Sequence, residues 1–260
     1  MNLEHAQNIV IALCKKAGED LKNSFTSGTF ITHSKGGVDF ATQQDDDIDT
    51  FLRNELRKAF PQTELLTEET AGEDFLDYPE KEYVWVIDPI DGTTNFSRGN
   101  PHFGISVGLV TKGVTILGVV YLPVENLLYT ATLDEEPLCN GKPIRVSKTT
   151  DLKAATVAVD FSWDLEKRRK TYEAFADVVT NIRQPLTLGS AAADICLVAS
   201  GKLDGYVQYG IKPWDHAAAN LILTKAGGKV TTIDGSTWNI FDGEILATNG
   251  LIHKNLLELL

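Results

Sequence analysis

The sequence predicts a mixed α and β protein in which helices cover β-sheets, and three observations lead to that prediction. Apolar residues recur at helical spacing over residues 3–17, so the chain opens with an amphipathic helix. In the middle of the chain, runs rich in β-branched and aromatic residues at 104–110, 115–121 and 127–131 favour an antiparallel meander. In the second half, predicted strands alternate with predicted helices, which is typical of a helix-covered sheet.

The other elements follow from local signals. Residues 24–37 hold three glycines and several hydroxyl side chains, which predicts a mobile loop or turn. Apolar residues at helical spacing over 48–60 predict a helix, and residues 137–147 read as a connection between two halves, 1–145 and 146–260. The second half contains predicted strands at 155–161 and 203–209 and predicted helices at 165–182, 191–199 and 213–225.

Composition limits the classes of protein to consider. The 260 residues are 43% hydrophobic and carry a net charge of -12, so we expect a folded protein that does not bind nucleic acid over a broad face. The three cysteines have no metal-ligand spacing and read as reduced, mostly buried thiols. Residues 1–16 lack the apolar core of a signal peptide, and no stretch reaches the roughly 20 apolar residues of a membrane span, so we expect a cytoplasmic protein.

The most informative stretch is 84–96, in which a short apolar run ends on Asp88, Pro89, Asp91 and Gly92 before small hydroxyl residues. A buried strand would thereby deliver two carboxylates to its carboxyl end, where helix-covered sheets collect ligands. Asp-Pro and Asp-Gly are also common turn dipeptides, and this stretch alone favours neither reading.

A covalent phospho-aspartyl mechanism also has to be considered, because a strand followed by Asp-x-Asp-Gly-Thr is the signature of the haloacid-dehalogenase phosphatases. Here the residue two positions before Asp91 is Pro89, which has no nucleophile, and Asp88 lies three positions before it. Two carboxylates on a turn with a carbonyl between them suit a hard divalent cation such as Mg²⁺ better.

Other acidic residues have structural as well as functional readings. Asp45 lies among acids in the first turn of a predicted helix, which the helix dipole explains. Glu68 and Glu69 follow a short predicted strand, so we expect only one of them to enter a given site. Asp215 begins a helix, and capping is the favoured reading from the local sequence. His216 is expected to be a packing or surface residue.

Four separated elements together resemble the inositol monophosphatase-like, metal-dependent sugar phosphatases. They span nearly the whole chain, in the order and spacing of that family. The elements are D-F-A-T-Q-Q-D at 39–45, Glu68-Glu69, W-V-I-D-P-I-D-G-T-T-N-F at 85–96, and W-D-H-A-A at 214–218 with Gly227-Gly228 beyond. The resemblance implies the layered α-β-α-β-α sandwich of the inositol monophosphatase and fructose-1,6-bisphosphatase type, and commonly a lithium-sensitive homodimer.

The resemblance also implies roles for individual residues. Glu68, Asp88 and the carbonyl of Ile90 would hold one Mg²⁺, and Asp88, Asp91 and Asp215 would hold a second. Asp45 and Thr93 would orient the attacking water, and Asp45 would help to hold a third, weaker ion. The amides of Gly92, Thr93 and Thr94 would receive phosphate oxygens. Gly189, Ser190 and Ala191 would line the side of the site that takes the sugar or polyol.

The implied reaction is in-line attack of a metal-activated water on a phosphomonoester, with Glu68 taking part in water activation. Where many inositol-hydrolysing members have a Glu, this chain has Gln208, whose amide lacks the charge that favours a diol. Inositol phosphate therefore competes with histidinol phosphate, fructose bisphosphate, NADP and adenosine bisphosphate as the expected substrate. A regulatory binding protein and a metal-stabilised structural protein remain as alternatives from other classes.

Overall fold

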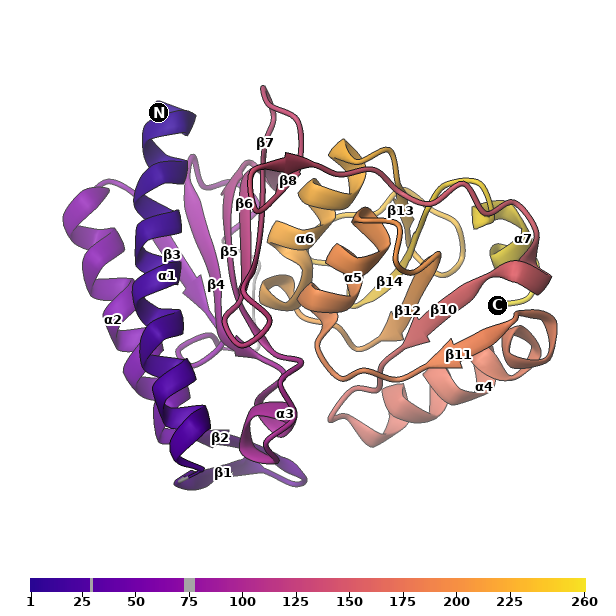
Figure 1. Ribbon diagram of the computed structural model, residues 1–260, viewed down its shortest axis with the longest axis horizontal. Helices are drawn as coiled ribbons and strands as arrows, with labels where there is room; N and C mark the ends of the chain where they lie inside the picture. The colour runs from indigo at the N-terminus through magenta and orange to yellow at the C-terminus, as the bar shows by residue number, and fades with distance from the viewer. Residues whose placement is uncertain (29, 73–77) are drawn as a thin grey trace.

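The computed structural model describes residues 1–28, 30–72 and 78–260, and its elements form five layers (Figure 1). Helices α1 (Leu3–Ser27) and α2 (Gln43–Ala59) cover one face of a seven-stranded sheet. Helices α5 (Ala191–Ala199) and α6 (Pro213–Lys225) separate it from a five-stranded sheet. Helices α4 (Leu165–Asn181) and α7 (His253–Leu257) cover the far side. The predicted layered sandwich is confirmed.

The seven-stranded sheet has the order β3-β4-β5-β6-β7-β8-β9. Its first pair, β3 and β4, is parallel, and the remaining neighbours are antiparallel, so the predicted meander is confirmed. The prediction of a plain connection at 137–147 was wrong, because β8 and β9 form a small hairpin there that extends the sheet. The strands are β3 (Glu64–Thr67), β4 (Val84–Asp91), β5 (Gly104–Thr111), β6 (Val114–Leu122), β7 (Leu127–Thr132), β8 (Leu138–Cys139) and β9 (Lys142–Pro143).

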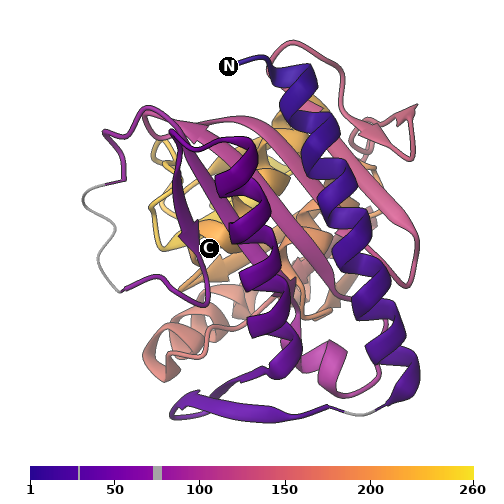
Figure 2. The same ribbon diagram turned by 90° about the vertical axis from the view of Figure 1, so that its left-hand side faces the viewer.

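The segment predicted to be a loop at 24–37 is more ordered than expected. Helix α1 continues to Ser27 and ends at Gly28, whose φ of 66° is in the left-handed region. Strands β1 (Thr32–Gly36) and β2 (Asp39–Thr42) then form an antiparallel hairpin, which lies below the two outer helices in Figure 2. Of its three glycines, Gly28 ends α1, Gly36 ends β1 and Gly37 lies in the turn of the hairpin.

The five-stranded sheet has the order β11-β10-β12-β14-β13. Strand β10 pairs in parallel with β11 and β12, so the carboxyl ends of these strands lie at one edge. The predicted strand at 203–209 begins two residues later, at Gly205. The strands are β10 (Thr156–Val159), β11 (Gln184–Leu186), β12 (Gly205–Tyr209), β13 (Lys229–Thr231) and β14 (Glu244–Thr248), and a short 3₁₀ helix, η1 (Leu152–Ala154), precedes them.

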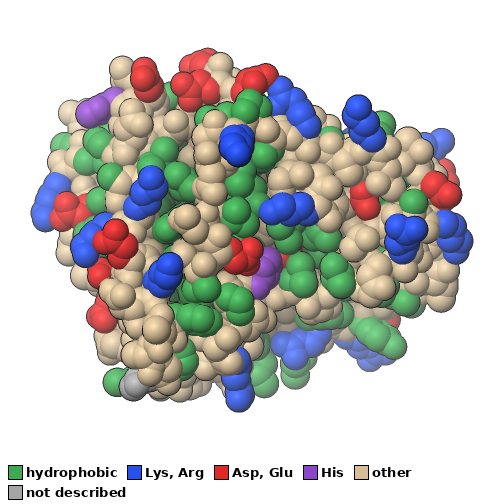
Figure 3. Space-filling model, in the orientation of Figure 1, with side chains coloured by type: hydrophobic (Ala, Val, Ile, Leu, Met, Phe, Trp, Pro, Cys, Tyr) green, Lys and Arg blue, Asp and Glu red, His purple; other side chains and the backbone are tan. Residues whose placement is uncertain are grey.

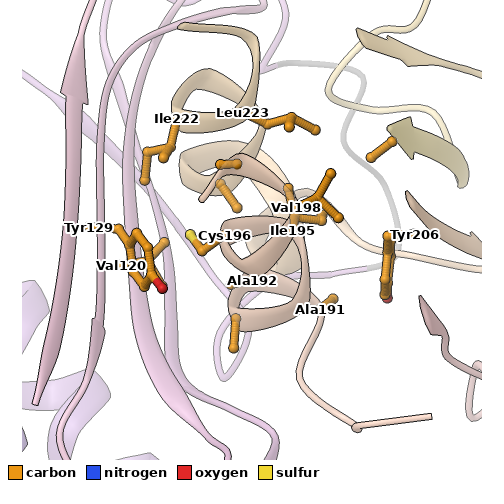
Figure 4. Packing of buried hydrophobic residues seen from close by; sticks show 14 of the residues in the cluster. Val120, Tyr129, Ala191, Ala192, Ile195, Cys196, Val198, Tyr206, Ile222 and Leu223 are labelled. Atoms are coloured by element: carbon orange, nitrogen blue, oxygen red, sulfur yellow. The ribbon is translucent and has the colours of Figure 1, made fainter. Parts of the chain in front are cut away.

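The middle layer is the most apolar part of the molecule. Figure 4 shows Ile195, Cys196 and Val198 of α5 packed with Ile222 and Leu223 of α6, among residues from both sheets. On β5 and β6, glycines let α6 approach closely: a Cβ at Gly118 would lie 2.5 Å from the carbonyl oxygen of Ala218. Close packing here fixes the first turn of α6, which carries Asp215, against the seven-stranded sheet.

The two sheets coincide with the two predicted halves, because the last strand of the first sheet ends at Pro143 and the second sheet begins at Thr156. The division of the chain into halves 1–145 and 146–260 that together complete one site stays a prediction. The cysteines are free thiols, with Cys14 and Cys196 buried. Within the described ranges, no helix is both long and apolar enough to cross a membrane. In Figure 3, acidic and basic side chains are interspersed over most of the face shown.

Candidate metal and phosphate site

Strand β4 ends in the two carboxylates that the sequence singled out. The side chains of Asp88 and Asp91 are only 2% and 6% exposed. The backbone N–H of Ile90 donates to Asp88 Oδ1 at 3.0 Å, and the pairing with β5 shifts register between the two aspartates. The irregular strand end therefore fixes the orientation of both acids. It also leaves the Ile90 carbonyl free to accept from Thr93, whose Oγ1 lies 3.1 Å away.

Asp45 reaches the same place from α2. Its Oδ2 accepts hydrogen bonds from the backbone N–H of Thr42, at 2.7 Å, and from the Thr42 hydroxyl, at 2.5 Å. Thr93 Oγ1 lies 3.0 Å from Asp45 Oδ1. Asp45 lies in the first turn of α2, as the helix-dipole reading expected, and it also caps the helix and contacts Thr93. The orientation of a water by Asp45 and Thr93 stays a prediction.

The expectation that Glu68 and Glu69 alternate along a strand was wrong, whereas entry of only one of them into the metal site stays a prediction. Strand β3 ends at Thr67, so the two acids lie in a turn and do not alternate as strand residues would. Both reach Lys35 of β1: Lys35 Nζ lies 2.8 Å from Glu68 Oε1 and 2.8 Å from Glu69 Oε1. The side chain of Lys35 therefore occupies the Glu68 side of the cluster.

Asp215 lies in the first turn of α6, where its Oδ2 accepts from the backbone N–H of Lys212 at 2.8 Å. Asp215 therefore caps α6, as the local sequence favoured, although it does so from the third helical position and Lys212 is the N-cap residue. The charges of Asp91 and Glu68 also act on Asp215, so its side chain belongs to the same cluster. The neighbouring His216 is fully buried and packs edge-on against Trp238, as expected of a packing residue.

Burial and mutual repulsion dominate the electrostatics of the cluster. Burial, followed by the charges of Glu68 and Asp91, raises the pKa of Asp88 well above its ordinary value. Burial raises the pKa of Asp45 to about 6 and that of Asp91 to about 7. Since each acid opposes ionisation of its neighbours, bound cations would relieve a repulsion that the fold has built in.

The donor set fits a hard divalent cation, because it consists of buried or partly buried carboxylates and a backbone carbonyl. In the described part of the chain, no group of three or more His, Cys, Asp or Glu side chains is arranged so that it could hold a metal ion. Several of the acids bond to other groups instead: Glu68 to Lys35, Asp215 to the N–H of Lys212, and Asp91 to the start of α5. Cation binding would exchange some of these internal contacts.

The residues predicted to bind phosphate, 92–94, lie in the turn after β4 and the first turn of α3 (Thr93–Ser97). Gly92 precedes α3 with a φ of 96°, a value that favours glycine. A Cβ at Gly92 would lie 3.1 Å from the Gly189 carbonyl oxygen, so the predicted phosphate turn and the predicted sugar-side turn are in contact. Thr94 lies in the first turn of α3, beside Thr93.

The predicted substrate residues of the second half have partners that the sequence did not indicate. Ser190 Oγ donates to Asp91 Oδ2 at 2.5 Å, and the N–H groups of Ala191 and Ala192 donate to the same carboxylate at 3.2 and 2.8 Å. Gln208, which is 8% exposed, accepts a hydrogen bond from the Tyr206 hydroxyl. The start of α5 therefore holds Asp91 directly.

Four further polar residues surround the site and were missed. Asn95 and His102 follow the phosphate turn, and Asp160 and Asp194 lie beside the start of α5. Asp160 Oδ1 accepts from the N–H of Gly189 at 3.1 Å. A usable signal existed for Asp194, because it is the charged residue of an otherwise apolar predicted helix at 191–199.

The fold and this cluster define a layered α/β protein with an acidic site at the ends of its strands and helices. The chain belongs to the inositol monophosphatase family, whose model matches residues 2–260. Glu68, Asp88, Asp91 and Asp215, which the motifs of that family had pointed to, are among the side chains that the fold gathers.

Known proteins resemble the chain over almost its full length. The Escherichia coli K12 protein named Nus factor SuhB is 36% identical, covering 96% of this chain and 93% of its own. Phosphatase IMPL1, chloroplastic, of Arabidopsis thaliana is 34% identical, covering 98% of this chain and 69% of its own. The solved inositol monophosphatase of Anabaena (Nostoc) sp. PCC 7120 superposes with a TM-score of 0.87 at 33% identity, covering 100% and 96%.

Proposed function

We propose that the protein is a Mg²⁺-dependent phosphomonoester hydrolase acting on a small polyol, sugar or nucleotide phosphate. The observation that carries the proposal is that acids from α2, β4, α6 and the turn after β3 lie close enough to oppose one another's ionisation, with Asp45, Asp88 and Asp91 buried and Glu68 and Asp215 partly exposed. Glu68, Asp88 and the Ile90 carbonyl would hold one ion, and Asp88, Asp91 and Asp215 a second. A third, weaker ion would lie near Asp45.

Bound Mg²⁺ would supply an acidified water and neutralise the charge that develops on the phosphate and leaving oxygens. The chain's own residues would do the rest. Asp45 and Thr93, whose side-chain oxygens are 3.0 Å apart, would accept and orient the protons of the attacking water. The N–H groups of Gly92, Thr93 and Thr94 would fix the phosphate oxygens, and Ser190 and Gln208 would face the leaving alcohol.

Gln208 favours a range of leaving alcohols wider than inositol. Its amide carries no charge to attract a diol, and its oxygen already accepts a hydrogen bond from the Tyr206 hydroxyl. Asp160 lies one strand away, after β10, and its Oδ2 is 3.4 Å from the same Tyr206 hydroxyl. The polyol side of the site is thus polar and acidic, and an alcohol rich in hydroxyl groups suits it.

A substrate panel tests the proposal. Inositol 1-phosphate, histidinol phosphate, fructose 1,6-bisphosphate, NADP and adenosine 3′,5′-bisphosphate would each be incubated with the protein, with and without Mg²⁺, and released phosphate measured. We expect Mg²⁺-dependent release from at least one ester and its loss in Asp91→Asn. Hydrolysis of none of them would count against the proposal, and a rise in melting temperature with Mg²⁺ alone would then favour a metal-stabilised structural role.

A regulatory role is the second candidate, because the 36%-identical Escherichia coli relative is named a Nus factor. The role would rest on binding a transcription protein, as a homodimer or a monomer, without turnover. Complementation separates the two functions: if Asp91→Asn folds normally and fully restores cells that lack the protein, binding is the function that matters. Failure of that variant to restore them favours catalysis.

A further inference from the structure

Two turns of the proposed site come from different halves of the chain, so only non-covalent contacts can hold them side by side. Residues 92–94 precede α3 in the first half, and residues 189–191 begin α5 in the second. Their backbones are close enough that a Cβ on Gly92 would come within 3.1 Å of the Gly189 carbonyl oxygen. Something must hold this alignment, because metal and substrate would contact both turns.

Asn95 makes the first connection. Its Nδ2 lies 2.7 Å from the Leu188 carbonyl oxygen and 3.3 Å from that of Gly189, both in the second half. The same Nδ2 lies 2.7 Å from the carbonyl oxygen of His102, which belongs to the first half. Asn100 Nδ2 donates to Asn95 Oδ1 at 2.9 Å and thereby fixes the orientation of the amide. One side chain therefore bonds to the backbone of both halves.

His102 makes the second connection. Its Nε2 lies 2.7 Å from Oδ1 of Asp194, which is fully buried in the first turn of α5. The other carboxylate oxygen of Asp194, Oδ2, is buried without a well-aligned hydrogen-bond partner among the described residues, and the carboxyl group of Asp160 lies beside that of Asp194. A buried carboxylate needs a donor, and His102 is well placed to supply it.

This connection ends on the helix that holds a proposed metal ligand. The first turn of α5 donates to Asp91 through the Ser190 hydroxyl and the N–H groups of Ala191 and Ala192. Asp194 lies on the same turn, and its own N–H bonds the Ser190 carbonyl at 2.9 Å. A shift of α5 would therefore move the donors that orient Asp91.

We propose that Asn95, His102 and Asp194 form an inter-turn clasp that positions Asp91 and keeps the phosphate turn aligned with the sugar-side turn. The clasp deepens the proposed function and rests on it. Its members act through Asp91 and the two turns, so they are positioning residues that touch neither substrate nor metal.

The test compares His102→Gln, Asp194→Asn, the double variant and Asn95→Asp with the unmodified protein. Isothermal calorimetry with Mg²⁺ alone measures metal affinity, phosphate release measures kcat and KM, and thermal unfolding measures stability. The control is His253→Gln, because His253 is also a buried imidazole, held by Thr231 and Thr248, but it lies outside the proposed site.

We expect His102→Gln and Asp194→Asn each to weaken Mg²⁺ binding and lower kcat by about ten- to a hundredfold, with little change in KM. Because the two side chains act as one pair, the double variant should lose little more kcat and Mg²⁺ affinity than the worse single variant, far less than the product of the two single losses. Asn95→Asp, which loses the amide donors, should lower kcat as well. The control should lose stability only.

The inference is overturned if the clasp variants behave like His253→Gln, with a lower melting temperature but unchanged Mg²⁺ affinity and kcat. Failure of the proposed function looks different. In that case the unmodified protein would release no phosphate, and calorimetry would still decide the clasp through the Mg²⁺ affinity of the variants. If the unmodified protein bound no Mg²⁺ at all, both the proposed function and the proposed role of the clasp would be wrong.

Discussion

At the scale of single residues, the hydrogen bonds that each carboxylate accepts determine how it is oriented within the cluster. Asp45 accepts from Thr42 and Thr93, whereas Asp91 accepts from Ser190 and the first amides of α5. The two acids thus have different surroundings and different proposed tasks, one toward water and one toward metal. Polar partners of this kind orient a group more tightly than burial alone.

Thr93 gives a test at this scale. Its Oγ1 lies 3.0 Å from Asp45 Oδ1 and 3.1 Å from the Ile90 carbonyl oxygen, so Thr93→Val removes a hydroxyl from between two site residues. We expect kcat for phosphate release to fall at least tenfold, while Thr93→Ser, which keeps the hydroxyl, retains most of it. Equal activity of the Val and Ser variants would show that the hydroxyl does not take part.

At the scale of elements, two features decide whether the site can form: the β1–β2 hairpin and the packing of α6. The hairpin brings Lys35 against Glu68 and Glu69, and α6 brings Asp215 against the end of the first sheet. One element therefore adds a positive charge to the cluster, and the other adds a negative one.

Lys35 should compete with a cation for Glu68. In Lys35→Met, the ammonium group at 2.8 Å from Glu68 Oε1 is gone, so we expect Mg²⁺ to bind several-fold more tightly by calorimetry. The metal-free variant should also melt at a lower temperature, because two partly buried glutamates lose their counter-charge. Unchanged or weaker Mg²⁺ binding would mean that the ammonium does not occupy the metal's place.

The approach of α6 can be tested through Gly118. A Cβ at this position would meet the Ala218 carbonyl oxygen at 2.5 Å, so Gly118→Ala should lower the free energy of unfolding by about 1–3 kcal/mol. Gly243→Ala is the matched control, because nothing lies within 4 Å of its added Cβ. Denaturant unfolding curves measure both, and similar stability of the two variants would contradict the close contact.

At the scale of the whole molecule, the acids of the cluster make metal-free folding depend on pH. Burial raises the pKa of Asp91 from 3.8 to about 7 and that of Asp45 from 3.8 to about 6. Burial, then the charge of Glu68, raises the pKa of Glu69 from 4.5 to about 7. Between about pH 4 and 7 the folded state therefore binds more protons than the unfolded state. The free energy of unfolding of the metal-free protein should fall as pH rises through that window.

The sign of that dependence predicts how Mg²⁺ will act. Since more of these carboxylates are ionised at pH 8 than at pH 5.5, where protons occupy them, the rise in melting temperature with Mg²⁺ should be larger at pH 8. Differential scanning calorimetry at the two pH values measures it. In metal-free protein, Asp91→Asn should shrink the fall in stability between pH 5.5 and 8; a Mg²⁺ effect independent of pH would contradict the coupling.

Much of the fold could be predicted from local sequence, because periodicity and turn residues are local properties. The helix at 191–199, the meander and the helix at 213–225 were confirmed within a few residues. The hairpins at 32–42 and 138–143 were missed, because their short strands carry little apolar periodicity and form through cross-strand pairing. The placement of Glu68 and Glu69 on a strand was wrong for a similar reason, since the end of β3 at Thr67 depends on its pairing with β4.

What the sequence determined by itself was the layered fold and the identity of the acids, because strand ends, capping residues and family motifs are written in short, contiguous stretches. Only the tertiary structure decided the partners: Lys35 beside Glu68, the start of α5 on Asp91, and His102 on Asp194. The physical reason is that a hydrogen bond depends on distance in space. Its two ends here are separated by as many as 101 residues, and only folding brings them within 3 Å.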